Sequence, residues 1–116
     1  MLFICYAKCS TCRKAEKYLL DKGFTLEKRD IKEAKPSLEE LKAWYKASGV
    51  PLKRFYNTSG RLYKELNLKD KIPTMSEEQQ LKLLASEGML VKRPIVIDGE
   101  KVLIGFKQAE YEEKGL

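Results

Sequence analysis

The first thirty residues alternate between strand-like and helix-like hydrophobic patterns, and this order restricts the fold more than any other feature. Residues Leu2–Tyr6 form a short apolar run that is typical of a buried strand. A polar turn over Ala7–Thr11 separates this run from a helical pattern that begins near Cys12 and stops at Gly23. Phe24–Ile31 then alternates between apolar and polar residues, as a second strand does. A strand, a helix and a strand in this order predict two parallel strands joined by a right-handed crossover.

The middle of the chain predicts helices. Ser37 and Ser76 each precede an apolar stripe, and each is followed three residues later by Glu or Gln, which is the pattern of a helix capping box. Gly49 and Gly88 mark the expected ends of these two helices. A shorter helix is expected between them, with the apolar residues Leu62, Tyr63 and Leu66.

The last part of the chain predicts a hairpin and a final helix. Ile95–Ile97 and Val102–Ile104 are apolar runs, and Asp98-Gly99 between them is a hairpin turn signal. Gln108–Lys114 is typical of a helix. The order β-α-β, then helices, then β-β-α is the thioredoxin-like plan, an α/β fold. We expect one domain over residues 1–116, with a helical insertion at about 35–90.

Length and composition are those of a small globular protein. The chain has 116 residues, of which 43% are hydrophobic and 34% charged. No apolar stretch reaches the roughly 18 residues of a membrane span, and the N-terminus does not resemble a secretory leader. We therefore expect a cytoplasmic protein that does not enter a membrane. The net charge of +6 comes from lysines interleaved with Glu, which favours a basic solvated surface over direct nucleic-acid binding.

The Cys9-Ser10-Thr11-Cys12 segment lies where the first strand gives way to the first helix. Free N–H groups and the dipole at a helix start stabilise negative charge, so a thiol placed there has a lowered pKa. The flanking cations Lys8, Arg13 and Lys14 act in the same direction. Since the chain has no His to serve as a base, we predict that the thiolate of Cys9 is the reactive group.

Cys12 follows Cys9 by three positions, which brings the two sulfurs within disulfide reach after a small adjustment. Cys12 is therefore the predicted resolving thiol. The alternative is half of a zinc site, but that needs further Cys or His ligands, and only Cys5 remains. Cys5 alternates within the first strand and is most simply a small core residue. No metal or cofactor is predicted.

Arg93-Pro94 directly precedes the strand at Ile95–Ile97. In a thioredoxin-like domain this proline is cis and packs beside the reactive cysteine. Arg93 would then present a permanently charged, forked donor to the thiol, although a surface arginine before a turn is the alternative. The polar turn at residues 57–60 also has two interpretations, because it either faces the reactive site or caps the helix that follows.

Three blocks of sequence resemble the ArsC/Spx family, and together they extend over nearly the whole chain. The blocks are Tyr6–Ala15 with its two cysteines, Leu62–Leu68, and Lys92–Asp98. The resemblance implies a thioredoxin-like domain with a helical insertion. It also implies one of two activities, because the family contains arsenate reductases and Spx-type redox-sensing regulators that bind the RNA polymerase α subunit.

By the same resemblance, Cys9 matches the nucleophile that attacks arsenate. Arg13 matches a basic residue that closely follows this nucleophile, and Arg93 matches the arginine before the cis-proline. We expect both arginines to stabilise the anion and the thiolate. The other residues expected to contact substrate are Lys8, Ser10, Thr11, Asn57, Arg61 and Pro94.

The chain also departs from the arsenate reductases at three places. Asn57 occupies the position of one expected arginine, and Leu103–Phe106 occupies the region of another. Each charge-assisted hydrogen bond contributes about 1.5–3 kcal/mol, so arsenate is held less firmly unless Arg54 or Arg61 reaches the site. Cys12 replaces the serine of the single-thiol reductases, and a cysteine pair of this kind is the Spx arrangement.

Three hypotheses follow from these features. The first is an arsenate-reductase-like enzyme with Cys9 as nucleophile and Cys12 as resolving thiol, which takes a small oxyanion or disulfide as substrate. Its reductant would be thioredoxin, glutaredoxin or a low-molecular-weight thiol. The second is an Spx-like transcription regulator in which oxidation of the cysteine pair changes binding to the polymerase α subunit. The third is a general glutaredoxin-like thiol transferase.

Overall fold

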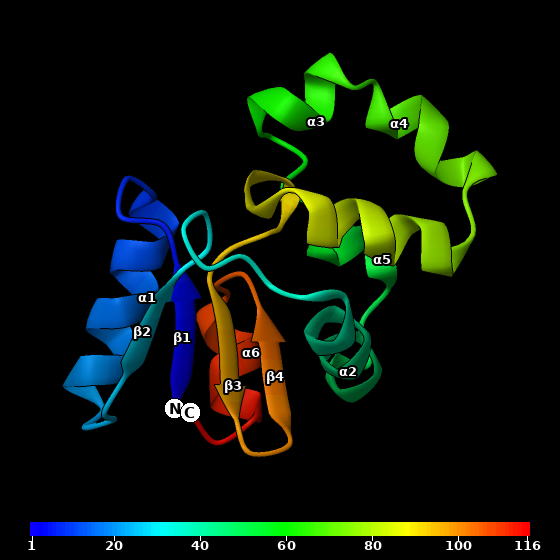
Figure 1. Cartoon of the computed structure of the whole chain (residues 1–116). Helices are drawn as coiled ribbons and strands as arrows, with labels where there is room; N and C mark the ends of the chain where they lie inside the picture. Colours follow the sequence, from blue (N-terminus) through cyan, green and yellow to red (C-terminus); the bar gives the residue numbers. More distant parts are fainter.

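A four-stranded sheet organises the computed structural model, which describes residues 1–116. The strand order is β2-β1-β3-β4, with β1 parallel to β2 and the other two pairs antiparallel (Figure 1). The predicted β-α-β and β-β-α order is therefore confirmed. The strands are β1 (Leu2–Cys5), β2 (Glu27–Asp30), β3 (Ile95–Asp98) and β4 (Lys101–Ile104).

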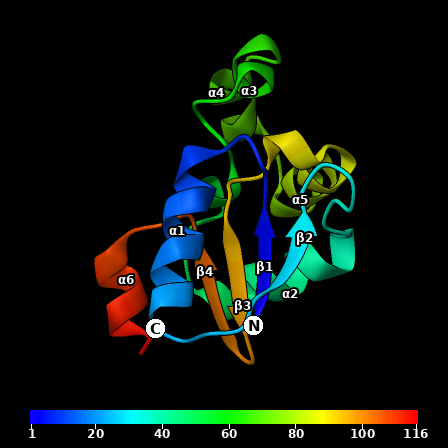
Figure 2. The same cartoon turned by 90° about the vertical axis from the view of Figure 1, so that its left-hand side faces the viewer.

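Helices cover both faces of the sheet (Figure 2). On one face lie α1 (Ser10–Asp21) and α6 (Gln108–Glu113), and on the other lie α2 (Leu38–Ser48) and α5 (Glu77–Ser86). Neighbouring residues of β1 point to opposite faces: Phe3 packs into the cluster under α1, and Ile4 into the larger cluster under α2 and α5. Both side chains are fully buried. None of the helices combines the length and apolarity needed to cross a membrane.

The segment between β2 and β3 holds more helices than the sequence predicts. Besides α2 and α5 it contains α3 (Arg61–Glu65) and α4 (Leu68–Lys71), which stand beyond one end of the sheet (Figure 1). The break between them lies at Asn67, whose φ of 53° is left-handed. Three short 3-10 turns complete the segment: η1 (Leu52–Phe55), η2 (Ile72–Thr74) and η3 (Gly88–Leu90).

The helix-capping signals that the sequence places at Ser37, Ser76 and Gly49 are confirmed. Both capping boxes form. The hydroxyl of Ser37 accepts the N–H of Glu40 and the hydroxyl of Ser76 accepts the N–H of Gln79, each at 3.1 Å. In return, the side-chain oxygens of Glu40 and Gln79 accept the backbone N–H groups of the two serines. Gly49 closes α2 with a φ of 69°.

Three predicted boundaries are wrong. Strand β2 covers only Glu27–Asp30, because β1 offers just four residues for pairing. The hairpin turn lies one residue later than the Asp98-Gly99 signal indicates, since Asp98 pairs with Lys101. Helix α5 ends at Ser86. The glycine beyond it, Gly88, serves close packing instead, because a Cβ there would lie 2.0 Å from the carbonyl oxygen of Ile31.

Candidate functional site

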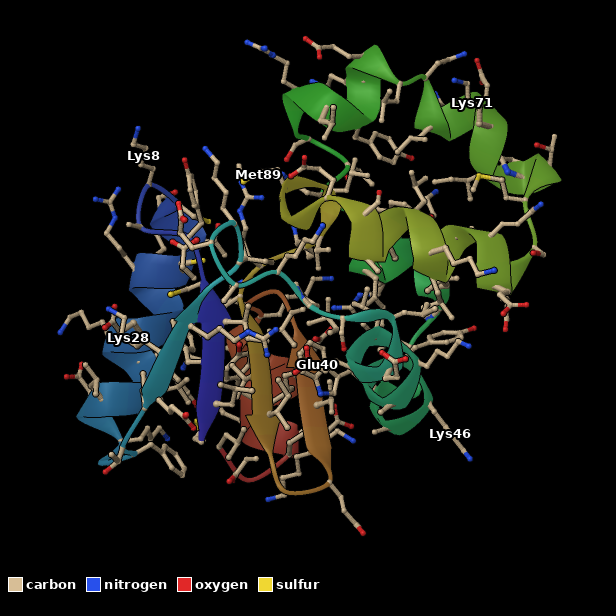
Figure 3. All side chains as sticks on the ribbon, viewed as in Figure 1. Lys8, Lys28, Glu40, Lys46, Lys71 and Met89 are labelled. Atoms are coloured by element: carbon tan, nitrogen blue, oxygen red, sulfur yellow. The ribbon has the colours of Figure 1, made fainter.

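The two cysteines lie where β1 ends and α1 begins. Cys9 is the N-cap residue of α1 in extended conformation, and its carbonyl accepts the N–H of Arg13 at 3.2 Å, the first hydrogen bond of the helix. Cys12 is in the first turn and is only 3% exposed. This loop lies opposite the loop that carries Met89, and Figure 3 labels Lys8 and Met89 on the two sides. The predicted placement of Cys9 just outside the helix is confirmed.

Both cysteines are free thiols, and their side chains are near neighbours at the start of α1. The Cys12 thiol is hydrogen-bonded to Cys9. The backbone N–H of Tyr6 donates to Sγ of Cys12 at 3.4 Å, which fixes the buried sulfur against the end of β1. Two cysteines placed one helical turn apart in this way are able to form a disulfide after a small adjustment.

The environment of Cys9 favours its thiolate. Burial opposes ionisation, but hydrogen bonds from the backbone N–H and thiol of Cys12, the charge of Arg93 and the N–H of Thr11 outweigh it. The pKa of Cys9 therefore lies below its ordinary value. Of the cations that the sequence offers, Arg93 is the one whose charge carries this effect.

The environment of Cys12 has the opposite effect. Burial is the main reason why the pKa of Cys12 is raised to about 12, and its hydrogen bond to Cys9 adds to the shift. Burial likewise raises the pKa of Cys5, which is half-buried at the end of β1. Since the thiolate is the attacking species of a cysteine, the surroundings of Cys9 favour nucleophilic attack more than those of Cys5 and Cys12 do.

A cavity of about 320 Å³ opens over Cys9. It is polar, and its cations are Lys8, Lys92 and Arg93, whereas no carboxylate lines it. None of the three cations makes a salt bridge. The other lining residues are Ser10, Thr11, Asn57, Ser59 and Gly60.

Arg93 is held above the thiol by weak contacts that leave most of its donors free. Its guanidinium lies 5.2 Å from the ring centre of Tyr6, and Nη1 donates to the carbonyl of Met89 at 3.4 Å. The Arg93-Pro94 peptide bond is cis, as predicted. Pro94 is buried and does not line the cavity; its carbonyl accepts the N–H of Gly105 at 2.8 Å.

The polar turn at residues 57–60 faces the cavity. Asn57, Ser59 and Gly60 line it, and Gly60 is the N-cap of α3 without any side-chain capping bond. The N–H of Gly60 donates to the carbonyl of Asn57 at 3.0 Å, which closes the turn. A Cβ on Gly60 would lie 2.6 Å from Nδ2 of Asn57, so the glycine lets the amide side chain pack against the turn.

Three arginines that the sequence suggested for the site do not line the cavity over Cys9. Arg13 is exposed on α1 and does not line the cavity over Cys9. Arg54 faces away, because its guanidinium forms two hydrogen bonds with Glu110, at 3.0 and 3.1 Å. Arg61 lines an adjoining cavity of about 350 Å³ together with Arg93. Its side chain is 90% exposed and bonds Glu65 at 2.9 Å.

Lys92 lines the cavity over Cys9 and is absent from the predicted site. Its backbone N–H donates to the carbonyl of Phe55 at 2.7 Å, which joins the loop before β3 to η1. Its place directly before Arg93-Pro94 is a sequence signal that could have identified it. Ser59 and Gly60 belong to the turn for which the sequence left both interpretations open.

This chain is similar both to the ArsC family and to proteins named as transcriptional regulators. Residues 5–114 match the sequence model described as the ArsC family. Uncharacterized protein YusI of Bacillus subtilis is 56% identical over 113 residues, which are 97% of this chain and 96% of YusI. The global transcriptional regulator Spx of Enterococcus faecalis is 28% identical over 103 residues, 88% of this chain and 76% of Spx.

Solved structures that resemble this chain are named for ArsC or for arsenate reductase. An ArsC family related protein from Bacteroides fragilis is 52% identical, with a TM-score of 0.94 over 97% of this chain and 94% of its own. A possible arsenate reductase from Streptococcus mutans is 41% identical, with a TM-score of 0.89 over 99% of this chain and 97% of its own. A cysteine at the start of α1, a cis-proline before β3 and a matching sequence over residues 5–114 agree: this chain belongs to the ArsC family, on a thioredoxin-like fold.

Proposed function

We propose that this protein is a dithiol reductase that converts arsenate to arsenite in the cytoplasm. The thiolate of Cys9 attacks arsenic, and a hydroxyl group of arsenate leaves as water after it takes up a proton. The sulfur of Cys12, after losing its proton, then attacks the sulfur of Cys9. The sulfur–arsenic bond breaks and its electron pair stays on arsenic, so arsenite leaves and the two protein thiols end as a disulfide.

One observation carries this proposal: the thiol with the lowered pKa lies in a cavity with cations and no carboxylate. Lys8, Lys92 and Arg93 suit an oxyanion that must approach a negatively charged sulfur, because they offset the repulsion between them. Arg93 has a forked guanidinium for two oxygens of the anion. The name of the Streptococcus mutans relative, a possible arsenate reductase, agrees with this chemistry.

The residues predicted from the sequence take these roles in the proposal. Cys9 is the nucleophile, Cys12 the resolving thiol, and Arg93 the group that stabilises both thiolate and anion. Ser10, Thr11 and Asn57 add hydrogen-bond donors at the wall of the cavity. Arg13 lies on the exposed surface of α1 and has no direct role, and Arg61 lines the adjoining cavity that Arg93 also lines.

The test is arsenate reduction, with thioredoxin and glutaredoxin systems offered separately as the source of electrons. We expect Cys9→Ser to abolish turnover in both systems, because the attacking sulfur is lost. Cys12→Ser should stop turnover with thioredoxin, since no internal disulfide forms. Cys5→Ser is the matched control and should keep its activity. Full activity of Cys9→Ser, with circular dichroism showing an intact fold, would rule the reductase out.

A second candidate is an Spx-like regulator, and the buried resolving thiol favours it. Cys12 is 3% exposed and hydrogen-bonded to Cys9, so the pair is able to switch between two states without any bound substrate. The relatives named as regulators agree with this function. A pull-down with purified RNA polymerase α subunit, under oxidising and reducing conditions, tests it. Absence of binding in both states would eliminate the regulator.

A further inference from the structure

A second cavity of about 310 Å³ lies beside the cavity over Cys9, but Cys9 does not line it. Lys92 lines both cavities, and they share no other residue. The second cavity is built from η1 with the turn after it, the residue before Arg93, and the segment after β4. Its volume lies within the range of about 300–1,000 Å³ that is typical of small-molecule sites, so it is a candidate for a ligand site apart from the reactive thiol.

The charge of the second cavity is unbalanced. Its cations are Lys53, Arg54, Lys92 and Lys107, and no carboxylate lines it. The guanidinium of Arg54 is neutralised by Glu110 at 3.0 Å. The three lysines make no salt bridge anywhere in the structure. Their ammonium groups therefore leave positive charge uncompensated around one hollow, which favours an anionic ligand.

Main-chain hydrogen bonds fix the frame that carries these lysines. The N–H of Lys92 donates to the carbonyl of Phe55 at 2.7 Å, which ties the segment before β3 to η1. The N–H of Gly105 donates to the carbonyl of Pro94 at 2.8 Å, which ties the segment after β4 to the same place. A Cβ on Gly105 would lie 3.2 Å from Cε of Lys92, so the stem of this lysine packs against the glycine. The cations are thus mounted around the cavity before a ligand arrives, which lowers the cost of binding one.

The placement of the lysines favours phosphate groups over carboxylates. The three ammonium groups come from three separate segments that line one hollow. A carboxylate is planar and presents two oxygens, whereas a phosphate group presents oxygens in tetrahedral directions, and lysine binds phosphate as a point charge. A short chain of phosphate groups also concentrates several negative charges in a small volume. Such a chain is able to meet all three lysines at once.

Other groups of the cavity suit the same ligand. Thr58 adds a hydroxyl donor to its wall. The backbone N–H groups of Thr58 and Phe106 make no hydrogen bond within the protein, so they remain available to a ligand oxygen. The ring of Phe106 is half-buried and adds an apolar wall for any organic part that the phosphates carry.

We propose that this second cavity binds the phosphate chain of a small di- or triphosphate, either inorganic or attached to a nucleoside. This site goes beyond the proposed reductase, because it contains no thiol and shares only Lys92 with the cavity over Cys9. A bound phosphate chain neutralises Lys92 and so weakens the attraction of a second anion to Cys9. The two anions therefore oppose each other's binding.

The first test is calorimetric titration with tripolyphosphate, ATP and adenosine, on the parent protein and on Cys9→Ser. We expect tripolyphosphate and ATP to bind both proteins and adenosine to bind neither. Equal affinities for the two anions assign the site to the phosphate chain alone, and tighter binding of ATP adds the nucleoside to the ligand. Failure of both anions to bind would overturn the proposal. Since Cys9→Ser lacks the reactive sulfur, this result stands apart from any result on arsenate reduction.

The second test locates the bound chain. Lys53→Gln and Lys107→Gln should each weaken tripolyphosphate binding about tenfold, because each removes a charge-assisted hydrogen bond. Lys46→Gln is the control for net charge, since Lys46 is exposed on α2, lines neither cavity, and points away from the site in Figure 3. Lys8→Gln removes a cation from the cavity over Cys9 only. A loss from Lys8→Gln as large as that from Lys107→Gln would place the anion over Cys9 and refute the second site.

The third test measures the link through Lys92. Iodoacetate is anionic and iodoacetamide is neutral, so the ratio of their alkylation rates at Cys9 reports the charge beside the sulfur. Saturating tripolyphosphate should lower this ratio about threefold, because the bound chain neutralises Lys92. An unchanged ratio, with tripolyphosphate bound, would refute the opposition between the two anions.

Discussion

At the scale of single residues, the two sulfurs of the site have opposite environments, and their pKa values are shifted in opposite directions. Cys9 has a lowered pKa because Cys12, Arg93 and the helix start all favour its thiolate. Cys12 is buried, and its pKa is raised to about 12. The hydrogen bond between them couples these properties, since the protonated sulfur of Cys12 is the donor that stabilises the anion on Cys9. One protonated and one ionised thiol is the pair that a two-step exchange requires.

We expect the rate at which iodoacetamide alkylates Cys9 to rise with pH and to level off below the ordinary thiol range of about 8.5. The deprotonated form reacts, so the midpoint of this curve reports the pKa. Arg93→Met should move the midpoint upward, because the charge that lowers the pKa is lost. Peptide mass mapping assigns the modified cysteine.

Arg13→Met is the companion variant, because Arg13 does not line the cavity over Cys9. Its midpoint should stay near that of the parent protein. A larger shift from Arg13→Met than from Arg93→Met would contradict the assignment of the stabilising cation.

At the scale of elements, short contacts between distant segments hold the inserted helices on the sheet. Arg29 at the end of β2 binds Glu40 in the first turn of α2 with two hydrogen bonds, at 2.6 and 2.8 Å. The same guanidinium donates to the carbonyls of Ala34 and Lys35, at 2.7 and 3.0 Å. The loop between β2 and α2 is thus organised by one side chain.

The Arg29–Glu40 pair predicts a pH-dependent stability. Hydrogen bonds from Arg29 lower the pKa of Glu40 to about 2. A carboxyl group with a depressed pKa contributes stability above its unfolded pKa of about 4.3, and the contribution is lost as pH falls toward the folded value. Glu40 is 34% exposed, so water screens the pair, and we expect Glu40→Gln to cost only about 1 kcal/mol at pH 7.

Urea unfolding of the parent protein and Glu40→Gln at several pH values tests this prediction. Gln retains the oxygen that accepts the N–H of Ser37, so the capping box is kept and only the charge is removed. The difference between the two proteins should shrink between about pH 5 and pH 2. A difference that stays constant over this range would show that the ion pair is not its source.

A second element-scale prediction concerns Gly88, which brings η3 against the end of β2. Any side chain there meets the carbonyl oxygen of Ile31 at 2.0 Å. Because that contact is with backbone and not with a flexible side chain, Gly88→Ala should destabilise the protein by about 1–3 kcal/mol. Urea unfolding measures the loss. Lys82→Ala, at an exposed position of α5, is the control, and an equal effect of both variants would count against a backbone clash.

The sequence predicts these elements well where the cause is local and poorly where it is tertiary. The capping boxes at Ser37 and Ser76 act within four residues, so the pattern alone identifies them. The cysteine pair is predictable because a strand and a helix fix its place. Lys92 joins the site only through the path of the loop before β3. Whether Arg54 or Arg61 is available to the site depends on which of them pairs with Glu110, and Arg54 is the one that does.

At the scale of the whole molecule, the site lies on loops that rest on both hydrophobic clusters. Tyr111 of α6 is fully buried, and its hydroxyl donates to the carbonyl of Gly105 at 2.8 Å. The N–H of Gly105 in turn donates to the carbonyl of Pro94. The cluster beneath α1 and α6 therefore supports the loop that carries Arg93, although no residue of α6 lines the cavity over Cys9.

Tyr111→Phe should destabilise the protein by about 1–3 kcal/mol, because it leaves a buried carbonyl without its donor. Tyr45→Phe is the control: its hydroxyl bonds Glu77 at 2.9 Å in an exposed position, and the change should cost less than about 0.5 kcal/mol. Urea denaturation compares the two. Equal losses would mean that burial of the hydrogen bond has no influence here.

The side chains of Lys8, Lys92 and Arg93 line the cavity over Cys9 and belong to neither hydrophobic cluster. Mutation is therefore free to remove charge at Lys8 or Lys92 at little cost to folding. Natural selection can retune what approaches the sulfur, from an inorganic anion to a peptide or another protein, on an unchanged scaffold. Enzymes and gene regulators within one lineage are the outcome that such freedom allows.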